Sequence, residues 1–384
     1  MPPHLGGLEV VAQALFDIYA TAGYEVRWVA SRVPADQPPT EDGRIRVGTW
    51  NGLERWLGVP WPIWGPGGIR AVAELVQWAD VLHVHDCLYV GSALTAFFAP
   101  RAQKPILLSQ HIGFVRYTSP ILNSLEHLAY WTVGRTVLHR VSHVVFCTPT
   151  AEEFVTGRLH QRLPASSTIL YGIDTERFRP PTTIERAEAR RRLGIPASGR
   201  VVLFTGRLVE KKGVDLFLEV GRQHRSDHFL IVGDGPLGPP MLENLTWIQF
   251  VPPHEMEHVY RAADVLLLPS HSEGFPMSIL EAMATGLPVI TSTGQSFATA
   301  LEREGACLLA DRTPQAFGEA LNHFWNTPGL AATMSDRSQQ LVRRAWGLER
   351  MGAQYLELIE SLTTDGARRP TSSWTGQERK RQVN

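Results

Sequence analysis

The sequence has little cysteine, little net charge and no long apolar run, and each shortage excludes a class of protein. Its three cysteines, Cys87, Cys147 and Cys307, lie far apart, which excludes a disulfide framework and indicates small buried residues in a reducing compartment. A formal net charge of −1 excludes the global basic field that indicates a nucleic-acid partner. No apolar run reaches the roughly 18–20 residues that span a bilayer. We therefore expect a cytoplasmic protein, with peripheral contact to the inner face of a membrane as an open alternative.

Length and composition indicate two globular domains. A chain of 384 residues is long for one domain, and 43% hydrophobic with 20% charged residues is typical of a soluble globular protein. Pro180-Pro181 and the charged run from Glu185 to Arg192 mark a boundary. We predict one domain over residues 1–180, a second over 181–362, and a polar, disordered tail over 363–384.

The most informative stretch covers residues 272–282. It follows an apolar run over residues 264–270 that is typical of a buried parallel strand, and a helix is expected to begin near Met277 and to end at Gly286. Ligands of such strand–loop–helix units bind at the carboxyl end of the strand. The unpaired N–H groups of Met277 and Ser278 are therefore placed to receive phosphate oxygens.

Two carboxylates, Glu273 and Glu281, bracket the start of this helix with seven residues between them. A carboxylate that faces a phosphate is repelled, so hydrogen bonds from sugar hydroxyls suit both residues better. The spacing alone favours a plainer interpretation, in which Glu273 belongs to an N-terminal turn and Glu281 is a solvated helix residue.

The residues around this pair resemble the nucleotide-sugar site of GT-B glycosyltransferases. The first Glu is followed by Gly-Phe, and the segment closes with Glu-Ala-Met-Ala-Thr-Gly-Leu-Pro-Val-Ile, which is most similar to the retaining family 4, or glycosyltransferases group 1. The resemblance implies that Glu273 contacts donor-sugar hydroxyls and that Glu281 holds the nucleotide ribose. It also implies a donor site that includes Phe275, Met277 and Ser278.

A second motif follows an expected strand over Val201–Thr205. This strand delivers Gly206 and Arg207 to its carboxyl end, and Lys212 precedes the next helix. Two cations on one loop suit a diphosphate, Arg as a planar fork and Lys as a point charge, although two isolated basic residues are usually just solvated. The segment resembles the family signature Gly-Arg-Leu-x-x-x-Lys-Gly, which implies that Arg207 and Lys212 bind the donor phosphates and that Gly206 belongs to the same donor site.

Further segments follow the same family pattern with weaker specificity. The expected strand over 244–251 ends in Phe250 and Val251, and the resemblance implies that their backbone contacts the base. Near the start of the chain, Gly6 and Gly7 open a helix, where no Cβ blocks a phosphate, and the resemblance implies that they approach the donor diphosphate. In the family a central strand precedes this loop. We expect a start codon placed too far downstream, rather than a compromised first domain.

Two expected strands of the first domain end in histidines. The segment 79–86 resembles the family pattern Asp-Val-(Ile/Val)-His-x-His, and its His85 either lines the cleft or is a structural histidine. The segment 105–113 resembles Thr-x-His-Gly, which implies that His111 approaches the donor sugar, although Ile112 separates this histidine from the glycine.

Two apolar segments leave their roles open. The tryptophans between Pro34 and Gly68 form either an aromatic cluster under a long loop or an acceptor- or membrane-facing surface; they are Trp50, Trp56, Trp61 and Trp64. The helical pattern from Ser124 to Arg140 predicts either a packed helix with a solvated face or an interfacial contact with a membrane.

Together these motifs predict a GT-B protein with two Rossmann-like parallel-sheet domains that face each other across a cleft. The implied reaction moves a sugar, with retention, from a UDP- or GDP-sugar to a hydroxyl of a glycan, glycolipid or small molecule in glycan, glycolipid or polysaccharide biosynthesis. Arg207, Lys212 and helix N-termini would stabilise the leaving diphosphate. No Asp-x-Asp motif occupies a cleft position, so we expect neither a metal nor a separate cofactor.

Three alternatives remain at this point. A sugar-nucleotide epimerase shares the architecture but gives no reason for the paired motifs around Arg207 and Glu273. A phosphorylase-like enzyme needs a lysine for pyridoxal phosphate, and the only lysines are Lys104, Lys211, Lys212 and Lys380. The third alternative is an inactive nucleotide-sugar-binding or scaffold protein, which would bind the donor without turnover.

Overall fold

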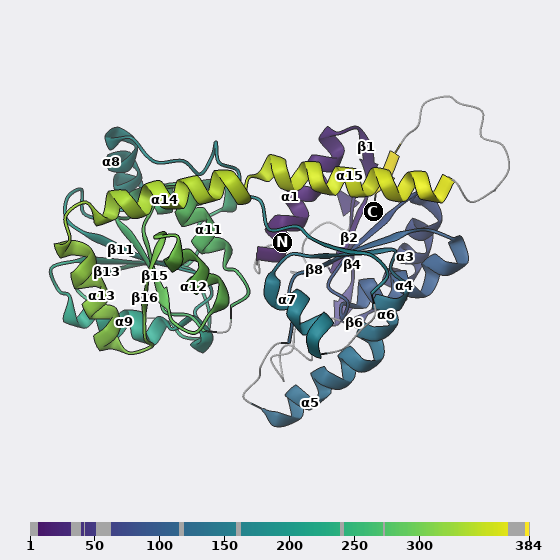
Figure 1. Ribbon diagram of the computed structural model, residues 1–384, viewed down its shortest axis with the longest axis horizontal. Coiled ribbons are helices and arrows are strands. Elements are labelled where there is room, and N and C mark those ends of the chain that lie inside the picture. Colours follow the sequence, from purple (N-terminus) through teal and green to yellow (C-terminus); the bar gives the residue numbers. More distant parts are fainter. Residues whose placement is uncertain are drawn as a thin grey trace. The chain divides into compact units, whose positions relative to one another are not determined.

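The chain forms two compact units. The computed structural model describes residues 7–31, 40–41, 43–50, 63–114, 119–158, 163–238, 242–271, 273–367 and 381–383. The first unit consists of Met1–Tyr171 together with Met351–Asn384, and the second unit is Gly172–Arg350 (Figure 1).

This division differs from the boundaries predicted at residues 180 and 362. The chain enters the second unit at Gly172, and it returns to the first unit inside the long helix α15 (Leu348–Ala367). The return is explained by tertiary contacts: the Tyr355 hydroxyl lies 2.7 Å from Ser109 Oγ, and Gly352 packs on Ile18. These long-range contacts leave no signal in the local sequence pattern.

A four-stranded parallel sheet organises the first unit. Its strand order is β10-β9-β8-β7, with bounds Ser166–Thr168, His143–Phe146, Ile106–Gln110 and Leu82–His85. All five residues of β8 are buried, as expected of a strand with both faces covered. The helices α3 (Pro66–Trp78) and α4 (Val90–Ala102) pack against each other, and residues of both contribute to the apolar core around the sheet.

Smaller elements complete the first unit. Two short strands, β1 (Tyr24–Val26) and β2 (Trp28–Ser31), follow helix α1 (Gly7–Thr21). β1 pairs with β17 (Arg381–Val383), β2 with β4 (Arg44–Val47), β4 with β3 (Thr40–Glu41), and β5 (Thr49–Trp50) with β6 (Ile63–Trp64).

The helix predicted over residues 124–140 is a composite of three elements. α5 (Pro120–Ala129) continues into a π-helical turn (Tyr130–Gly134) and then into α6 (Arg135–Arg140). It begins four residues earlier than expected, because Ser119 accepts a hydrogen bond from Leu122 N as N-cap and Pro120 suits the first turn. A similar pair, α7 (Pro149–Glu153) and a π-turn (Phe154–Arg158), follows β9.

The second unit contains a six-stranded, fully parallel sheet. Its order is β13-β12-β11-β14-β15-β16, with bounds Leu245–Ile248, His228–Val232, Val201–Thr205, Val265–Leu268, Val289–Ser292 and Cys307–Ala310. The connections after β11 and β14 lead in opposite directions along the sheet, so the topological switch point lies between these two strands. The rule for such sheets places a ligand at their carboxyl ends.

The helices of the second unit begin with α8, which precedes β11, and the others come between or after the strands. They are α8 (Thr183–Arg192), α9 (Val214–Gln223), α10 (Met256–Ala262), α11 (Met277–Ala284), α12 (Ser296–Arg303), α13 (Pro314–Asn326) and α14 (Leu330–Ala345). The predicted limits of α11 are confirmed: it begins at Met277, and Gly286 follows its end at a φ of +71°. Within the described ranges, no helix combines the length and the apolar character that crossing a membrane requires.

Candidate active site

Glycines bring two loops into backbone contact at the carboxyl ends of β11 and β12. Gly206 and Gly233 have φ angles of +140° and +145°, and Gly206 N donates to Val232 O at 3.0 Å. A Cβ on Gly233 would lie 1.9 Å from Gly206 O, and a Cβ on Gly235 would lie 2.5 Å from Leu208 O. No larger residue fits this contact, which fixes the loop that carries Arg207 and Lys212.

The structure brings Lys212 and Glu273 together at the switch point. Lys212 Nζ lies 3.1 Å from Glu273 Oε1, and the two side chains are only 14% and 11% exposed. Lys211 Nζ lies 4.0 Å from the same oxygen and is 40% exposed. Glu273 is therefore paired with a lysine of the neighbouring loop, rather than being an unattached residue of a helical turn.

Backbone contacts hold these two loops against each other. Gly213 has a φ of +72°, and a Cβ there would lie 2.3 Å from Pro269 O. His271 N donates to Lys211 O at 2.9 Å. The ion pair is thus built on two rigid connections between the loop after β11 and the loop after β14.

Burial and charge act in opposite directions on Lys212. Burial lowers the pKa of its ammonium group, the neighbouring Glu273 raises it, and the cations of Lys211 and Arg207 lower it further. An additional anion beside Lys212 would therefore be stabilised by three cationic side chains.

Gln295 is a site residue that the motifs did not indicate. Its Oε1 accepts a hydrogen bond from Glu273 N at 3.2 Å, and its Nε2 donates to Ser270 O at 3.3 Å. It lies in the loop between β15 and α12, directly before Ser296. Its position after the carboxyl end of a strand next to β14 was the available signal, because ligands of such sheets bind at the carboxyl ends of the strands.

Several polar groups at this edge of the sheet have no partner among the described residues. The first two amides of α11, Met277 N and Ser278 N, make no hydrogen bond within the part of the chain that the structure describes, whereas Ile279 N donates to Pro276 O at 3.0 Å. Arg207 is exposed, and no ion pair or hydrogen bond joins its guanidinium to any described residue. Free amides at a helix N-terminus and a free guanidinium are groups that bind anions.

Phe275 has an aromatic environment. Its ring lies 5.3 Å from that of Phe297 and 5.2 Å from that of Trp346. These contacts fix the loop between Glu273 and α11. A direct contact of Phe275 with a donor stays a prediction.

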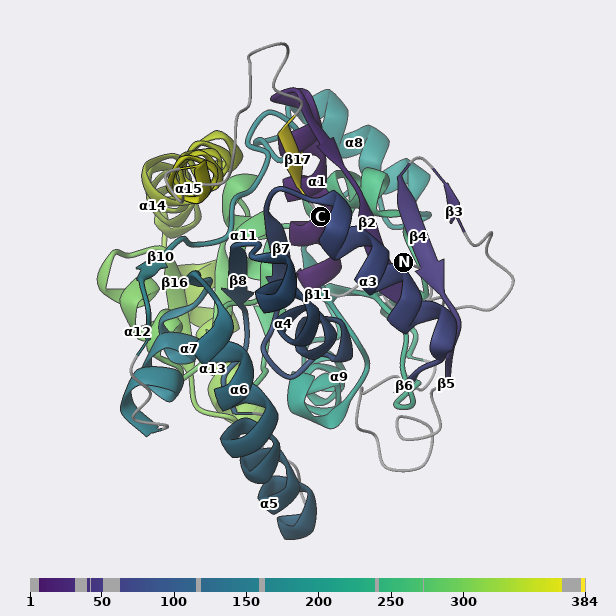
Figure 2. The same cartoon turned by 90° about the vertical axis from the view of Figure 1, so that its right-hand side faces the viewer.

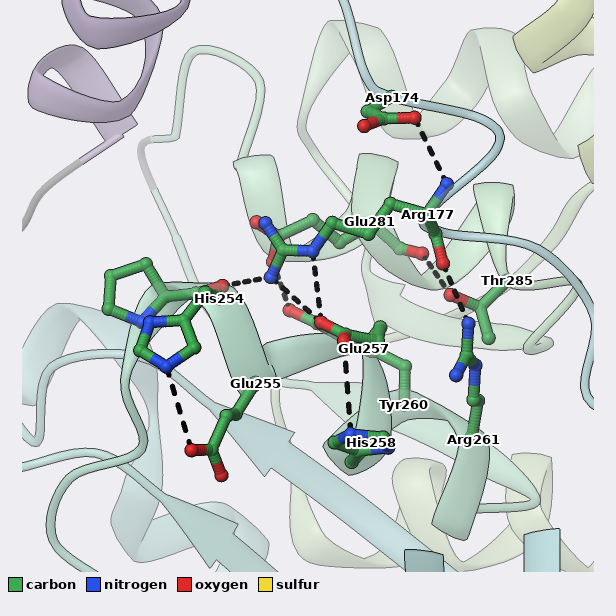
Figure 3. A network of polar contacts seen from close by, with 11 residues as sticks. Asp174, Arg177, His254, Glu255, Glu257, His258, Tyr260, Arg261, Glu281 and Thr285 are labelled. Carbon is green, nitrogen blue, oxygen red and sulfur yellow. Dashed lines mark hydrogen bonds and ion pairs between the residues drawn. The ribbon is translucent and has the colours of Figure 1, made fainter. Parts of the chain in front are cut away.

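Glu281 is at the centre of a polar network (Figure 3). The Tyr260 hydroxyl donates to Glu281 Oε2 at 2.5 Å, and Thr285 Oγ1 donates to the Glu281 carbonyl. Arg177 donates two hydrogen bonds to Glu257 Oε2, at 2.9 and 2.8 Å, and a further one to Pro253 O. The interpretation of Glu281 as a solvated helix residue is therefore wrong.

This environment sets the ionisation of Glu281. Burial raises the pKa of its carboxyl group to about 7, while the hydrogen bond from Tyr260 and the charge of Arg177 lower it. Oε1 has no hydrogen-bond partner within the described ranges, so this oxygen remains available to a ligand hydroxyl.

Phe250 and Val251 lie beyond the edge strand β13. The expected strand ends at Ile248, so both residues belong to the loop before Pro252, and the Phe250 side chain is exposed. Two strands, β12 and β11, separate β13 from the switch point. Their predicted contact with a base is not tested by this geometry.

The first unit contains a row of three histidines, in which His111 is buried and His83 and His85 are half-buried. His111 is 2% exposed, its Nε2 lies 2.8 Å from His85 Nδ1, and its Nδ1 lies 3.3 Å from Tyr171 Oη. The adjacent His83 lies 2.8 Å from Ser109 Oγ through Nε2 and 3.1 Å from Tyr19 Oη through Nδ1. Burial lowers the pKa of all three histidines, that of His85 to about 4, so all three imidazoles are neutral at pH 7.

Asp86 holds the turn in which Ile112 separates His111 from Gly113. It adopts a φ of +53°, and its Oδ1 accepts hydrogen bonds from Gln110 Nε2 (3.0 Å), His111 N (2.9 Å) and Ile112 N (3.3 Å). Burial raises the pKa of Asp86 to about 7, against the lowering effect of the backbone hydrogen bonds. No motif indicated a role for Asp86, although it directly follows His85.

The remaining predicted positions have mixed outcomes. Gly7 is the first residue of α1, whereas Gly6 lies outside the described residues. Trp56 and Trp61 also lie outside them; Trp64 packs against the core and donates to Ser31 Oγ at 3.0 Å, and Trp50 is exposed. Among the described side chains, no cluster of three or more His, Cys, Asp or Glu is arranged to hold a metal ion.

Two family models match this chain. The model of Glycosyltransferase Family 4 matches residues 5–177, and that of Glycosyl transferases group 1 matches residues 199–327. The first match covers the histidine row, and the second covers the Lys212–Glu273 pair and Glu281.

Curated relatives and solved structures agree with these matches. A D-inositol 3-phosphate glycosyltransferase of Kineococcus radiotolerans is 27% identical over 89% of this chain and 87% of its own length. A putative teichuronic acid biosynthesis glycosyltransferase of Bacillus subtilis, TuaC, is 31% identical over 67% of this chain and 64% of its own length. The fold is similar to that of Anabaena HepE in complex with UDP-glucose, with a TM-score of 0.74 at 16% identity over 93% of this chain and 97% of that one. It is also similar to a sucrose-phosphate synthase from Thermosynechococcus elongatus, with a TM-score of 0.73 at 20% identity over 94% of each chain.

Proposed function

The chain belongs to family 4 of the GT-B glycosyltransferases, also called group 1, and we propose that it transfers a sugar from a UDP- or GDP-sugar to an acceptor hydroxyl with retention at the anomeric carbon. The observation that carries the proposal is the Lys212–Glu273 pair, 3.1 Å apart at the switch point of the second unit. A structure of Anabaena HepE, which has this fold, contains UDP-glucose, and this supports a nucleotide-sugar donor.

The donor diphosphate is assigned to the loop after β11 and to the N-terminus of α11. Lys212 supplies an ammonium that is 14% exposed, while Arg207 supplies a guanidinium and Met277 and Ser278 two amides that no described residue occupies. Gly206 leaves room for the phosphate to approach the backbone. These groups stabilise the charge that develops on the leaving diphosphate without a metal.

The sugars of the donor are assigned to the two carboxylates. Glu273, fixed by Gln295 and Lys212, accepts hydrogen bonds from the donor-sugar hydroxyls. Glu281 accepts one from a ribose hydroxyl through Oε1, because Tyr260 already occupies Oε2. Phe275 positions the loop between them, and Phe250 and Val251 contact the base through their backbone.

In the first unit, His111 is assigned to the donor sugar and Gly7 to the diphosphate. Both ring nitrogens of His111 already have partners, and the contact with Tyr171, at 3.3 Å, is longer than that with His85, at 2.8 Å. A sugar hydroxyl therefore replaces Tyr171 as the partner of Nδ1, while His85 keeps the ring in place.

The transfer itself needs no protein nucleophile. The bond between the anomeric carbon and the diphosphate oxygen breaks, a bond to the acceptor oxygen forms on the same face, and the acceptor proton passes to the leaving phosphate. The acceptor is a glycan, glycolipid or small molecule handled in the cytoplasm; the D-inositol 3-phosphate and teichuronic acid enzymes among the relatives support this range.

Calorimetric titration with UDP and with GDP tests the donor site. We expect one of them to bind, and Glu281→Ala to weaken its binding by about 1–3 kcal/mol, because the ribose hydroxyl loses its acceptor. NMR of the product then shows whether the anomeric configuration is kept. If neither diphosphate binds to folded protein, the donor assignment is wrong; binding without turnover on any acceptor would instead indicate a nucleotide-sugar-binding protein.

A further inference from the structure

Exposed apolar side chains gather on the composite helix in the first unit. Five large apolar residues within positions 121–133 are exposed, and we call them the apolar stripe: Ile121 (72%), Leu125 (49%), Leu128 (58%), Trp131 (51%) and Val133 (39%). The spacing of 121, 125 and 128 places those side chains on one helix face. Both views of the ribbon show α5 reaching away from the four-stranded sheet of the same unit (Figures 1 and 2).

The C-terminal part of this composite helix is firmly packed. Tyr130 is buried, its ring lies 4.7 Å from that of Phe154, and its hydroxyl donates to Gly113 O at 2.9 Å. Val137 and Leu138 are buried in the core of the unit. The stripe is therefore presented by a helix that is anchored through its C-terminal part, and Glu126 is the buried residue of α5.

The charges around the stripe have one sign. Between residues 119 and 140 the only acid is Glu126, which is buried. Arg135 is exposed and lies 5.7 Å from the Trp131 ring, and Arg140 is exposed while donating one hydrogen bond to Ala96 O. Because the whole chain has a net charge of −1, this cationic excess is local.

These features fit an anionic bilayer better than a protein surface. At a bilayer interface apolar side chains insert below the headgroups, Trp lies at headgroup level, and Arg extends to the lipid phosphates. A second copy docked stripe to stripe would bring the Arg135 side chains of both copies together, and this segment exposes no acid to pair with them.

We propose that the apolar stripe, with Arg135 and Arg140, docks the protein on the surface of a membrane that contains anionic lipid. Where the proposed transferase function holds, this surface selects a membrane-borne acceptor, a glycolipid, over a soluble small molecule. The docking surface does not depend on catalysis, so the two proposals can fail separately.

Flotation with lipid vesicles tests the surface directly. Wild-type protein should float with vesicles of phosphatidylcholine and phosphatidylglycerol and much less with phosphatidylcholine alone. Replacing Leu125 and Leu128 by Ser should weaken binding by at least about tenfold. Ile184→Ser is the matched control, since Ile184 is an exposed apolar residue on α8 of the second unit and its loss should leave flotation unchanged.

The electrostatic part has its own variant. Arg135→Glu should reduce binding to the anionic vesicles about fivefold or more. Added salt should weaken the vesicle binding of this variant less than that of wild type. Binding of UDP by all variants shows that they are folded and that the donor site stands. The proposal is overturned if wild type does not float, if the Leu125 and Leu128 double variant floats like wild type, or if sedimentation shows a dimer that this variant dissociates.

Discussion

The two units differ in whether the polar groups of their candidate site residues have hydrogen-bond partners among the described residues. In the second unit, Arg207 and the first two amides of α11 have no partner among the described residues, although they lie at the switch point. In the first unit, His83 and His111 have partners on both ring nitrogens, inside the core. The comparison teaches that the family motifs of the second unit are arranged to receive a ligand, whereas the histidines of the first unit already form a closed network that a ligand has to enter.

The largest effect is expected at Gly233, where the second unit has no space for a Cβ atom. Gly233→Ala places a Cβ 1.9 Å from Gly206 O at a φ of +145°, so the two loops must separate, at a cost of about 4 kcal/mol or more in the free energy of unfolding. Urea unfolding measures this. Gly199→Ala is the control, because Gly199 also has a positive φ, +97°, but no atom within 4 Å of its Cβ position; equal losses for both variants would show that the backbone contact does not matter.

The histidine network of the first unit should make the stability of the protein fall at acidic pH. His85 has a pKa of about 4 in the folded protein and 6.5 as its ordinary value, so the unfolded chain binds this proton first as the pH falls. Stability is therefore lost between pH 6.5 and about 4, by up to about 3 kcal/mol for this residue. His85→Gln should reduce that loss, whereas His254→Gln, at an exposed position in the second unit, should not.

Asp86 opposes this dependence. Its pKa is raised to about 7 from 3.8, so the folded state holds this proton more tightly, and its contribution to stability is present at low pH and lost as the pH rises toward 7. The measurement is therefore the difference between wild type and His85→Gln in urea midpoints across the acidic range. Parallel curves for the two proteins would contradict the closed network.

Substitutions of the two neighbouring lysines should distinguish a lysine that binds the ligand from one that is mainly solvated. Lys212→Met should weaken UDP binding by about 2–3 kcal/mol, because a charge-assisted contact with phosphate is lost and Glu273 keeps a buried charge without its partner. Lys211→Met, whose ammonium lies 4.0 Å away and is 40% exposed, should cost less than about 1 kcal/mol. Calorimetry distinguishes them, and equal losses would place the phosphate outside the loop.

The smallest effect is expected at Tyr260. Tyr260→Phe removes the hydrogen bond that lowers the pKa of Glu281, so more of this carboxyl group is protonated at pH 7 and UDP affinity should fall by about 1 kcal/mol. The loss should shrink in more alkaline buffer, where the carboxylate is restored. A loss that does not change with pH would show that Tyr260 acts through packing alone.

Local patterns were sufficient for the elements around the second unit's site. The apolar run before residue 269, the helix start at Met277 and the glycine after its end each depend on neighbouring residues, and the structure confirms them as β14, α11 and Gly286. The same holds for the strand β11 before Gly206. Such strand, helix-start and glycine signals depend on residues that are consecutive in the sequence.

The side-chain partners could not be predicted in the same way. Tyr260 and Gln295 reach Glu281 and Glu273 from other helices and loops, 21 and 22 residues away in sequence. Tyr171 meets His111 across 60 residues. A single sequence gives no measure of such proximity, so the roles of Glu281 and His111 could be named while the groups that hold them could not.

The contact between Ser109 and Tyr355 has a consequence for the order in which the protein acquires its structure during synthesis. The two hydroxyls are 246 residues apart in the chain, and both residues are fully buried. The second unit is one uninterrupted segment and can fold as soon as it has left the ribosome, whereas the first unit must wait for α15, although most of it is made earlier. Until then α15 does not cover Ser109 and the neighbouring histidines. A chaperone that binds nascent chains would therefore bind the first unit, most of which is translated before the second.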